Sequence, residues 1–333
     1  MKFLLTGGSG FVGGNLARLL VSKGHSVTAL VRRTSNRKGL SALGVKFAVG
    51  DIATGDGLFE AMEGVECVQH VAGVTKAWTE AEYQAGNAQG TRHVCEAIAR
   101  CPKPPRLVYC SSLAAAGPAR VGHPRNERDE SKPVSRYGRS KLAAEEVVRQ
   151  FASRIPALIL RPPFVYGPGD ATNLPPLMAM ARWGVYLKAG FGPKQFSFIH
   201  VDDLCAALYQ ASFHGSTLSE SDPTQGVYFV ADPAQYSWEQ FCEALSQAMG
   251  KSKPRVIPLP EMFGYAAGLG SELGGRVMGT VPIMSRDKAR EMRCEAWTCS
   301  TERAQSEMSF QAVHALVGGL EHTVAWYRKE GWI

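Results

Sequence analysis

The sequence predicts an α/β protein built on a doubly wound parallel sheet with a smaller, interleaved C-terminal lobe. Short apolar runs typical of buried parallel strands alternate with helical segments from the first residues onward. The first run leads directly into a turn that contains Gly7, Gly10 and Gly13. A glycine-rich turn between a strand and a helix is the context in which a dinucleotide binds, so the pattern indicates a Rossmann-type sheet.

Each element of the first unit has a local reason. Phe3–Leu5 is short and apolar, a helix begins near Phe11 and ends at Gly24, and the next strand spans residues 25–31. In the turn, the first glycine allows a tight bend and the second lets backbone N–H groups approach a pyrophosphate. The third lets the helix pack closely on the strand. The phosphates then lie at a helix N-terminus, where free donors favour anions.

The end of the second strand predicts which cofactor binds. An acid there normally binds the ribose 2′-hydroxyl of NAD, whereas the 2′-phosphate of NADP needs a cation. Val31 is followed by Arg32 and Arg33, and residues 34–38 contain no acid. A solvated basic loop would explain the charge but not the missing acid. We therefore expect NADP(H), with NAD(H) left open as a second cofactor.

Further strands of the same sheet are expected at residues 45–49, 67–72, 106–110, 157–160 and 226–230. In an open parallel sheet, ligands bind beyond the carboxyl ends of the strands. Candidate functional residues follow several of these ends, among them Asp51, Gly73 and Ser112.

Composition narrows the classes of partner. The chain has 333 residues, a net charge of +7 and dispersed basic residues interleaved with acids, which favours an anionic small molecule over nucleic acid. The eight cysteines form no C-x-x-C pair and no metal-ligand spacing, so we expect reduced thiols in a cytoplasmic protein and no metal. No apolar segment is long enough to predict an integral membrane protein.

Four residues form the expected catalytic group. Tyr137 and Lys141 share one helix face because they are four residues apart, and Ser112 follows a predicted strand. Asn87 is the expected fourth member. A nearby ammonium and an oxidised nicotinamide should lower the pKa of the Tyr137 phenol, so that Tyr137 exchanges a proton while Ser112 binds the substrate oxygen.

The ordered motifs resemble the extended short-chain dehydrogenase/reductase family, also called the NAD-dependent epimerase/dehydratase family, over essentially the whole chain. The matching segments are Thr6–Gly13, Gly50–Ile52, His70–Gly73, Asn87–Thr91, Ser111–Gly117, Tyr137–Lys141, Arg161–Gly169 and Phe198–Leu204. The resemblance selects Ser112 over Ser111 as the catalytic hydroxyl. Together with the glycine turn and the two arginines, it implies cofactor contacts from Gly7, Ser9, Gly10, Phe11, Val12, Gly13, Arg32, Arg33, Asp51, Ile52, Val71, Ala72, Gly73, Lys141, Pro162, Pro163 and Val165.

Departures from the family pattern narrow the reaction. Leu113 and Ala114 stand where sugar 4,6-dehydratases of the family carry an acid pair, and Phe164 replaces the asparagine of many nucleotide-sugar enzymes. Val31 and Arg32 resemble reductases related to dihydroflavonol reductase, and Arg161–Asp170 resembles the 3β-hydroxysteroid dehydrogenase branch. These features favour interconversion of a ketone and a secondary alcohol on a largely apolar small molecule. A nucleotide-sugar epimerase with tightly bound NAD(P) and a non-catalytic NADP(H)-sensing protein remain the alternatives.

By the same resemblance, the dinucleotide-binding domain comprises residues 1–166 and 196–232, and the substrate lobe residues 167–195 and 233–333. We expect Trp78 and Phe164 to contact substrate, and ordinary packing for the other aromatic and apolar candidates, which are Tyr83, Leu174, Trp183, Tyr186 and Phe196. Met262, Tyr265, Leu269 and Leu273 recur at helical spacing and predict a packed helix of the lobe, with a lid or a membrane-facing helix as the other interpretations. A homodimer is left open by the family analogy.

Overall fold

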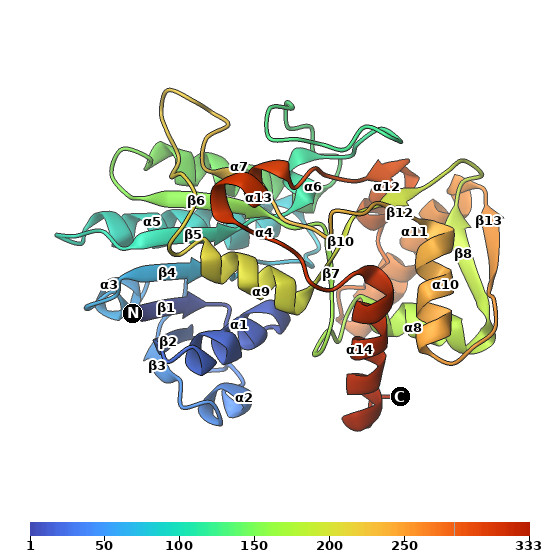
Figure 1. Cartoon of the computed structure of the whole chain (residues 1–333), viewed down its shortest axis with the longest axis horizontal. Helices are drawn as coiled ribbons and strands as arrows, with labels where there is room; N and C mark the ends of the chain where they lie inside the picture. Colours follow the sequence, from blue (N-terminus) through green and yellow to red (C-terminus); the bar gives the residue numbers. More distant parts are fainter. Residues whose placement is uncertain (283) are drawn as a thin grey trace.

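The computed structural model describes residues 1–282 and 284–333. Its largest feature is a seven-stranded parallel sheet with the strand order β11-β6-β5-β4-β1-β2-β3 (Figure 1). The strands are β1 (Lys2–Thr6), β2 (Ser26–Val31), β3 (Lys46–Val49), β4 (Cys67–His70), β5 (Arg106–Cys110), β6 (Ala157–Arg161) and β11 (Val227–Phe229). The predicted doubly wound parallel sheet is therefore confirmed.

Two hydrophobic cores cover the two faces of the sheet. Side chains alternate along β1, so that Phe3 and Leu5 enter one core and Leu4 the other, all three being buried. One core is shared with α1 (Phe11–Ser22), α2 (Lys38–Ser41), α9 (Val201–Gln210) and α13 (Glu302–Met308). The other is shared with α3 (Leu58–Ala61), α5 (Gly90–Ala99) and α7 (Arg136–Gln150). Burial on both faces explains why the strands lack polar alternation.

Three short elements complete the side of the sheet that carries α7. They are α4 (Glu80–Gln84), the π-helical turn η1 (Ala85–Gln89) and α6 (Leu113–Ala116). All three pack against α7. These contacts bring the segments after β4 and β5 next to the helix that contains Tyr137.

The smaller lobe has its own core, at the right of Figure 1. That core joins β7 (Phe164–Tyr166) and β10 (Phe198–His200) to α8 (Leu174–Trp183), α10 (Trp238–Ala248) and α14 (Leu316–Lys329). The remaining elements are β8 (Val185–Ala189), β9 (Gln195–Phe196), β12 (Tyr236–Ser237), β13 (Arg255–Leu259), α11 (Glu261–Met278), α12 (Arg286–Arg293) and β14 (Ala296–Trp297).

The chain passes between the two parts more than once. After the lobe segment that contains α8, it returns to the large sheet through α9 and β11, and β11 pairs in parallel with β6. Near the C-terminus, α13 packs Ala304 and Met308 into the same core as β1. Division at the expected boundaries stays a prediction, but these crossings keep the two parts in contact along the carboxyl ends of the strands.

Candidate active site

The glycine turn after β1 is packed too tightly for any other residue type. Gly7 has φ +75°, and a Cβ at this position would lie 2.7 Å from the backbone N of Ala72. A Cβ on Gly13 would lie 2.2 Å from the carbonyl oxygen of Gly7. Gly10 precedes α1, and among the described residues no side chain caps that N-terminus. The free N–H groups at this glycine-lined helix end fit a cofactor pyrophosphate.

The residues expected near the adenosine surround the ends of β2 and β3. Arg32 and Arg33 are exposed directly after β2, as the sequence predicts. The Asp51 carboxylate accepts the N–H of Ala53 at 2.9 Å, which closes the turn after β3. Ile52 packs over Gly90, because a Cβ added to Gly90 would lie 3.2 Å from Cδ1 of Ile52. Two cations and no acid therefore follow β2.

Ser112, Tyr137 and Lys141 meet at the carboxyl end of β5. Ser112 begins α6, and its Oγ accepts the N–H of Ala114 at 3.1 Å. The Tyr137 hydroxyl is hydrogen-bonded to Ser112. Lys141 is buried one turn along α7, and its Nζ donates to the carbonyl oxygen of Cys110 at 2.7 Å. The structure thus brings together the three residues that the sequence nominated from positions up to 29 residues apart.

Asn87 joins this group through a distortion of the helix before α5. It is buried in the π-helical turn η1, and π-turns often mark functional positions. Its Oδ1 accepts the N–H of Val74 at 2.7 Å and its Nδ2 donates to Ser140 Oγ at 2.8 Å. A Cβ on Gly73 would lie 3.0 Å from Asn87 Oδ1 and 3.7 Å from Lys141 Nζ. Asn87 therefore fixes the segment after β4 beside Lys141.

The protein environment moves the pKa values of both titratable residues. Burial raises the pKa of the Tyr137 phenol well above its ordinary value; the nearby Cys110 thiol adds to the rise, and the hydrogen bond with Ser112 opposes it. Burial also lowers the pKa of Lys141 to about 8. The expected lowering of the Tyr137 pKa by Lys141 is thus not produced by the chain alone, since desolvation dominates. At neutral pH the phenol keeps its proton.

A buried ion pair lies behind the catalytic group. The guanidinium of Arg161 donates to Glu145 through Nε at 2.9 Å and through Nη2 at 2.5 Å. Ser111 donates to the same carboxylate at 2.5 Å. Arg161, which begins one of the segments that match the family, therefore has Glu145 as its charged partner. This pair links α7 to the ends of β5 and β6.

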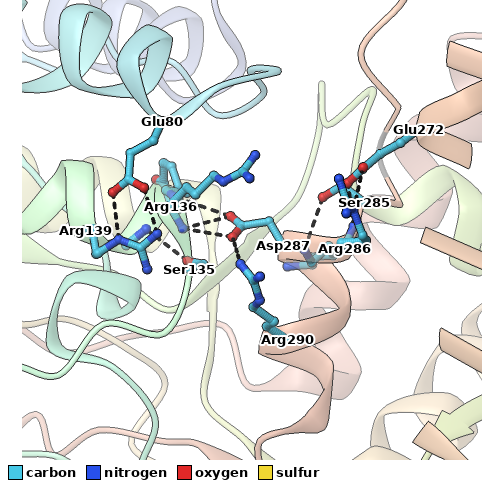
Figure 2. Close-up of polar contacts among 12 residues, drawn as sticks. Glu80, Ser135, Arg136, Arg139, Glu272, Ser285, Arg286, Asp287 and Arg290 are labelled. Atoms are coloured by element: carbon cyan, nitrogen blue, oxygen red, sulfur yellow. Dashed lines mark hydrogen bonds and ion pairs between the residues drawn. The ribbon is translucent and has the colours of Figure 1, made fainter. Parts of the chain in front are cut away.

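The first turn of α7 receives a carboxylate from the smaller lobe, which sequence reasoning missed. Figure 2 shows Asp287 of α12 pointing at this turn. Its Oδ1 and Oδ2 accept the N–H of Arg136 at 2.9 and 3.0 Å, and Oδ2 lies 3.5 Å from the N of Tyr137. No spacing signal connects positions 150 residues apart, although an acid near a helix N-terminus is favourable. Asp287 therefore places α12 directly against the turn that contains Tyr137.

Trp78 lies close to this junction. Its carbonyl oxygen accepts a bond from Arg136 Nη1 at 3.1 Å, and its indole ring lies 6.0 Å from the Arg276 guanidinium of α11. Tyr83, from the same segment, has its ring centroid 6.2 Å from that of Tyr137. The loop after β4 is thus held between α7 and α11. Contact of Trp78 with substrate stays a prediction.

The segment expected at the nicotinamide end follows β6. The Pro162 carbonyl oxygen accepts the N–H of Leu113 at 2.8 Å, which fixes this segment to α6. Pro163 is half-buried, and Val165 pairs with Ile199 and packs against the core that contains α1. Phe164 points into the aromatic core of the lobe, 5.7 Å from Phe198 between ring centroids. Contact of Phe164 with substrate stays a prediction.

Trp183 is the exception among candidates of which most were expected to pack, because 86% of it is exposed at the end of α8. The expectation of a packed apolar side on one lobe helix is wrong. Met262, Tyr265, Leu269 and Leu273 do lie on one helix, α11, but this side is exposed. The packed side consists of small residues: Gly268 lies against Ser285 and Arg286, and Gly275 against Trp78. Close helix packing through glycine turned the large apolar side chains outward.

A polar cluster that sequence spacing did not predict lies outside the site. His200, Asp202, His314 and His322 each place one donor atom within 4.8 Å of the others. His200 Nδ1 accepts the N–H of Asp202 at 3.3 Å and so caps α9, while His314 Nδ1 lies 3.1 Å from Asp203 Oδ1. That the protein binds no metal stays a prediction, and the contact of His314 with Asp203 joins the start of α14 to α9.

Comparisons with known proteins agree with this fold. The sequence model of the NAD dependent epimerase/dehydratase family matches residues 3–222. Ceramide reductase of Caulobacter vibrioides is 32% identical over 331 residues, covering 99% of this chain and 95% of that protein. A 4-hydroxy-2-methyl-3-oxo-4-farnesyl-3,4-dihydroquinoline-1-oxide ketoreductase of Stigmatella aurantiaca is 32% identical over 281 residues, covering 82% and 80%. UDP-glucose 4-epimerase of Thermotoga maritima, solved with UDP-glucose, has the same fold, with a TM-score of 0.79, 19% identity and 99% coverage of both chains.

Proposed function

Because the chain belongs to the NAD dependent epimerase/dehydratase family, we propose that it is an NADPH-dependent ketoreductase that acts on a largely apolar ketone. The observation that carries the proposal is the buried Tyr137 hydroxyl, which keeps its proton at neutral pH and is hydrogen-bonded to Ser112. A protonated phenol beside a second hydroxyl is suited to give a proton to a carbonyl oxygen. The reductive direction follows from that protonation state.

In this proposal each residue of the site has one role. Reduced nicotinamide, when bound, supplies a hydride to the carbonyl carbon. Tyr137 gives its proton to the carbonyl oxygen, which Ser112 orients through its hydroxyl. With the hydride on carbon and the proton on oxygen, the ketone becomes a secondary alcohol. Lys141 remains mostly protonated below pH 8 and stabilises the phenolate that Tyr137 becomes. Asn87 keeps the loop after β4 and Ser140 in place around these groups.

NADP(H) is preferred because of the cations after β2. Arg32 and Arg33 are exposed at the strand end where a 2′-phosphate lies in this fold, and a guanidinium binds phosphate with parallel hydrogen bonds. The carboxylate of Asp51 is engaged by the Ala53 N–H at the end of the next strand. The pyrophosphate would lie at the N-terminus of α1, between Gly7 and Gly13.

The relatives support an apolar ketone as substrate. Both 32% identical relatives are named as reductases, and their names specify a ceramide and a farnesylated quinoline ketone. The aromatic setting of Phe164 agrees with this class of substrate, since many nucleotide-sugar enzymes have a hydrogen-bonding side chain at that position. An epimerase remains the second candidate because the fold is also that of UDP-glucose 4-epimerase.

The test is NADPH oxidation with a panel of sugar, steroid and 3-oxoacyl ketones, for the wild-type protein and Tyr137→Phe. We expect the variant to bind NADPH with an unchanged Kd and to lose turnover by a factor of about 10² to 10⁴. Equal turnover in the variant would refute the role of Tyr137 as proton donor. Tighter binding of NADH than of NADPH by the wild type would refute the cofactor preference. A cofactor that stays bound through purification, without net turnover, would identify an epimerase. NADPH binding without turnover of any ketone would favour a sensor.

A further inference from the structure

The outward side of α11 is a continuous row of large apolar side chains. Its members recur at helical spacing over about 22 Å of helix. They are Met262, Phe263, Leu269, Leu273 and Val277, with exposed fractions of 73, 55, 41, 55 and 89%. Large exposed apolar patches on soluble domains mark interaction surfaces. We call these five residues the α11 face.

The orientation of α11 is fixed by its other side. Gly268 and Gly275 pack closely because they lack a side chain. A Cβ added to Gly268 would lie 2.8 Å from the backbone of Ser285, and one added to Gly275 would lie 2.5 Å from the carbonyl oxygen of Thr280. Two ion pairs with α12 secure the helix, Glu272 with Arg286 at 2.8 Å and Glu261 with Arg293 at 2.7 Å. Rotating α11 to bury the α11 face would break these contacts. The face therefore stays exposed in the folded chain.

The chemistry of the face indicates its occupant. None of its five side chains can donate or accept a hydrogen bond, and the hydroxyl of the neighbouring Tyr265 is already bonded to Arg286. Protein interfaces carry about one hydrogen bond per 100–200 Å² of buried area, whereas the acyl region of a bilayer offers none and needs none. An apolar helix face of this kind inserts at a membrane surface.

Cationic side chains lie on the neighbouring helix α12, which packs against α11. Helix α12 has four basic and two acidic residues. A surface cavity of about 290 Å³ lies between the two helices and is lined by Val134, Glu261, Arg290, Arg293 and Cys294. Arg293 is paired with Glu261 at 2.7 Å through Nε, and Arg290 with Asp287 at 3.6 Å through Nη1. A guanidinium has five N–H donors, so each side chain keeps donors beyond its paired nitrogen that suit a phosphate headgroup.

We propose that α11 docks this protein on the surface of a bilayer that contains anionic lipid, with the α11 face in the acyl region and the cavity of Arg290 and Arg293 over a headgroup. No described helix is long and apolar enough to span a membrane, so the contact is peripheral. The buried side of α11 touches Trp78, and α12 caps the turn that contains Tyr137. If the proposed function is correct, the docked face lies beside the route by which a membrane-resident ketone reaches Tyr137.

The test is flotation of the full chain with vesicles of phosphatidylcholine, or of an equimolar mixture of phosphatidylcholine and phosphatidylglycerol. We expect binding to both, stronger with the anionic lipid. Leu269→Ser combined with Leu273→Ser should lower binding about tenfold or more. Arg290→Gln, which leaves both ion pairs between α11 and α12 intact, should weaken the preference for anionic lipid. The matched control is Val313→Ser with Val317→Ser, two exposed apolar residues outside α11, which should leave binding unchanged.

Activity separates this inference from the proposed function. With a short-chain, water-soluble ketone, the leucine variant should turn over like the wild type, whereas with a long-chain 3-oxo ester dissolved in vesicles it should be slower. Absence of wild-type vesicle binding would overturn the docking proposal even if the soluble ketone is reduced. A dimer in sedimentation that the leucine variant converts to monomer, without any vesicle binding, would instead show that a second copy covers the face. Vesicle binding without reduction of any ketone would uphold docking and reject the proposed function.

Discussion

Removing the carboxylate of Asp287 should impair catalysis from outside the catalytic group. Asp287 belongs to α12 and accepts the N–H of Arg136 with both oxygens, at 2.9 and 3.0 Å, in the first turn of α7 (Figure 2). Ser135 caps the same helix from within, since its Oγ accepts the N–H of Gly138. The helix should therefore survive the change, while the turn that contains Tyr137 loses its external support.

The size of the effect follows from the contacts. A hydrogen bond to a charged group contributes about 1.5–3 kcal/mol, and a negative charge at a helix N-terminus about 0.3–1 kcal/mol. Asp287→Ala removes both, so the free energy of unfolding should fall by about 1.5–3 kcal/mol. Asp287→Asn keeps an acceptor oxygen and should cost about 1 kcal/mol or less. If about 1 kcal/mol of this loss appears in the positioning of Tyr137, kcat falls about fivefold.

The assay combines denaturant unfolding with steady-state reduction of the best ketone of the panel. We expect Asp287→Ala to lower kcat and leave the Kd of NADPH unchanged, because the proposed site for the cofactor phosphates is at the N-terminus of α1. Ser285→Ala is the control, since it removes the cap of α12 itself, the bond from the Lys288 N–H, without touching α7. An equal loss of kcat in both variants would refute a direct role of Asp287 and indicate a general loosening of α12.

Two further predictions concern the glycine turn and Lys141. Gly13→Ala should lower the free energy of unfolding by about 1–3 kcal/mol and weaken NADPH binding, because its Cβ would lie 2.2 Å from the Gly7 carbonyl oxygen. In the control Gly14→Ala, the Cβ would lie 3.5 Å from the Gly8 carbonyl oxygen, so this change should be neutral or stabilising. Equal effects of the two changes in urea unfolding would contradict this reasoning. The pKa of Lys141 is about 8 in the folded chain, below its ordinary value of 10.5. Between pH 8 and pH 10.5 the unfolded chain therefore binds a proton that the folded chain lacks. The free energy of unfolding consequently rises with pH across this window. Relative to Lys141→Met, the wild type should therefore gain about 3 kcal/mol across this window in denaturant titrations, and a constant difference would show that Lys141 is not desolvated.

Local patterns predicted the large sheet, and they selected Ser112, Tyr137 and Lys141, which the structure brings together. The strand expected at residues 106–110 has the same boundaries as β5, because a short apolar segment between turn signals is typical of a buried strand. The expected strand at 67–72 ends at His70, since Val71 and Ala72 leave the sheet toward Gly7. Tyr137 and Lys141 were found through a spacing of one helical turn, which the helix geometry alone guarantees.

Contacts between distant segments could not be predicted in the same way. Asp287 is one of several acids in a charged helix, and only the fold shows that its carboxylate ends at the N–H of Arg136 rather than in solvent. The raised pKa of the Tyr137 phenol in the chain alone could not be predicted for a related reason. Sequence spacing locates the ammonium of Lys141 on the same helix face, but the desolvation that controls the phenol comes from every element packed around it.

Helix α11 shows where apolar periodicity is ambiguous. Met262, Leu269 and Leu273 follow the same spacing as the buried side of any globular helix, and the pattern alone favours packing. The decisive residues were the glycines on the opposite side, because a helix buries whichever side allows its backbone to come closest to a neighbour. Gly268 against Ser285 and Gly275 against Thr280 fill that role here. A glycine row opposite an apolar row in a helix with few charges is therefore a signal, readable from sequence, that the apolar row faces something other than the chain itself.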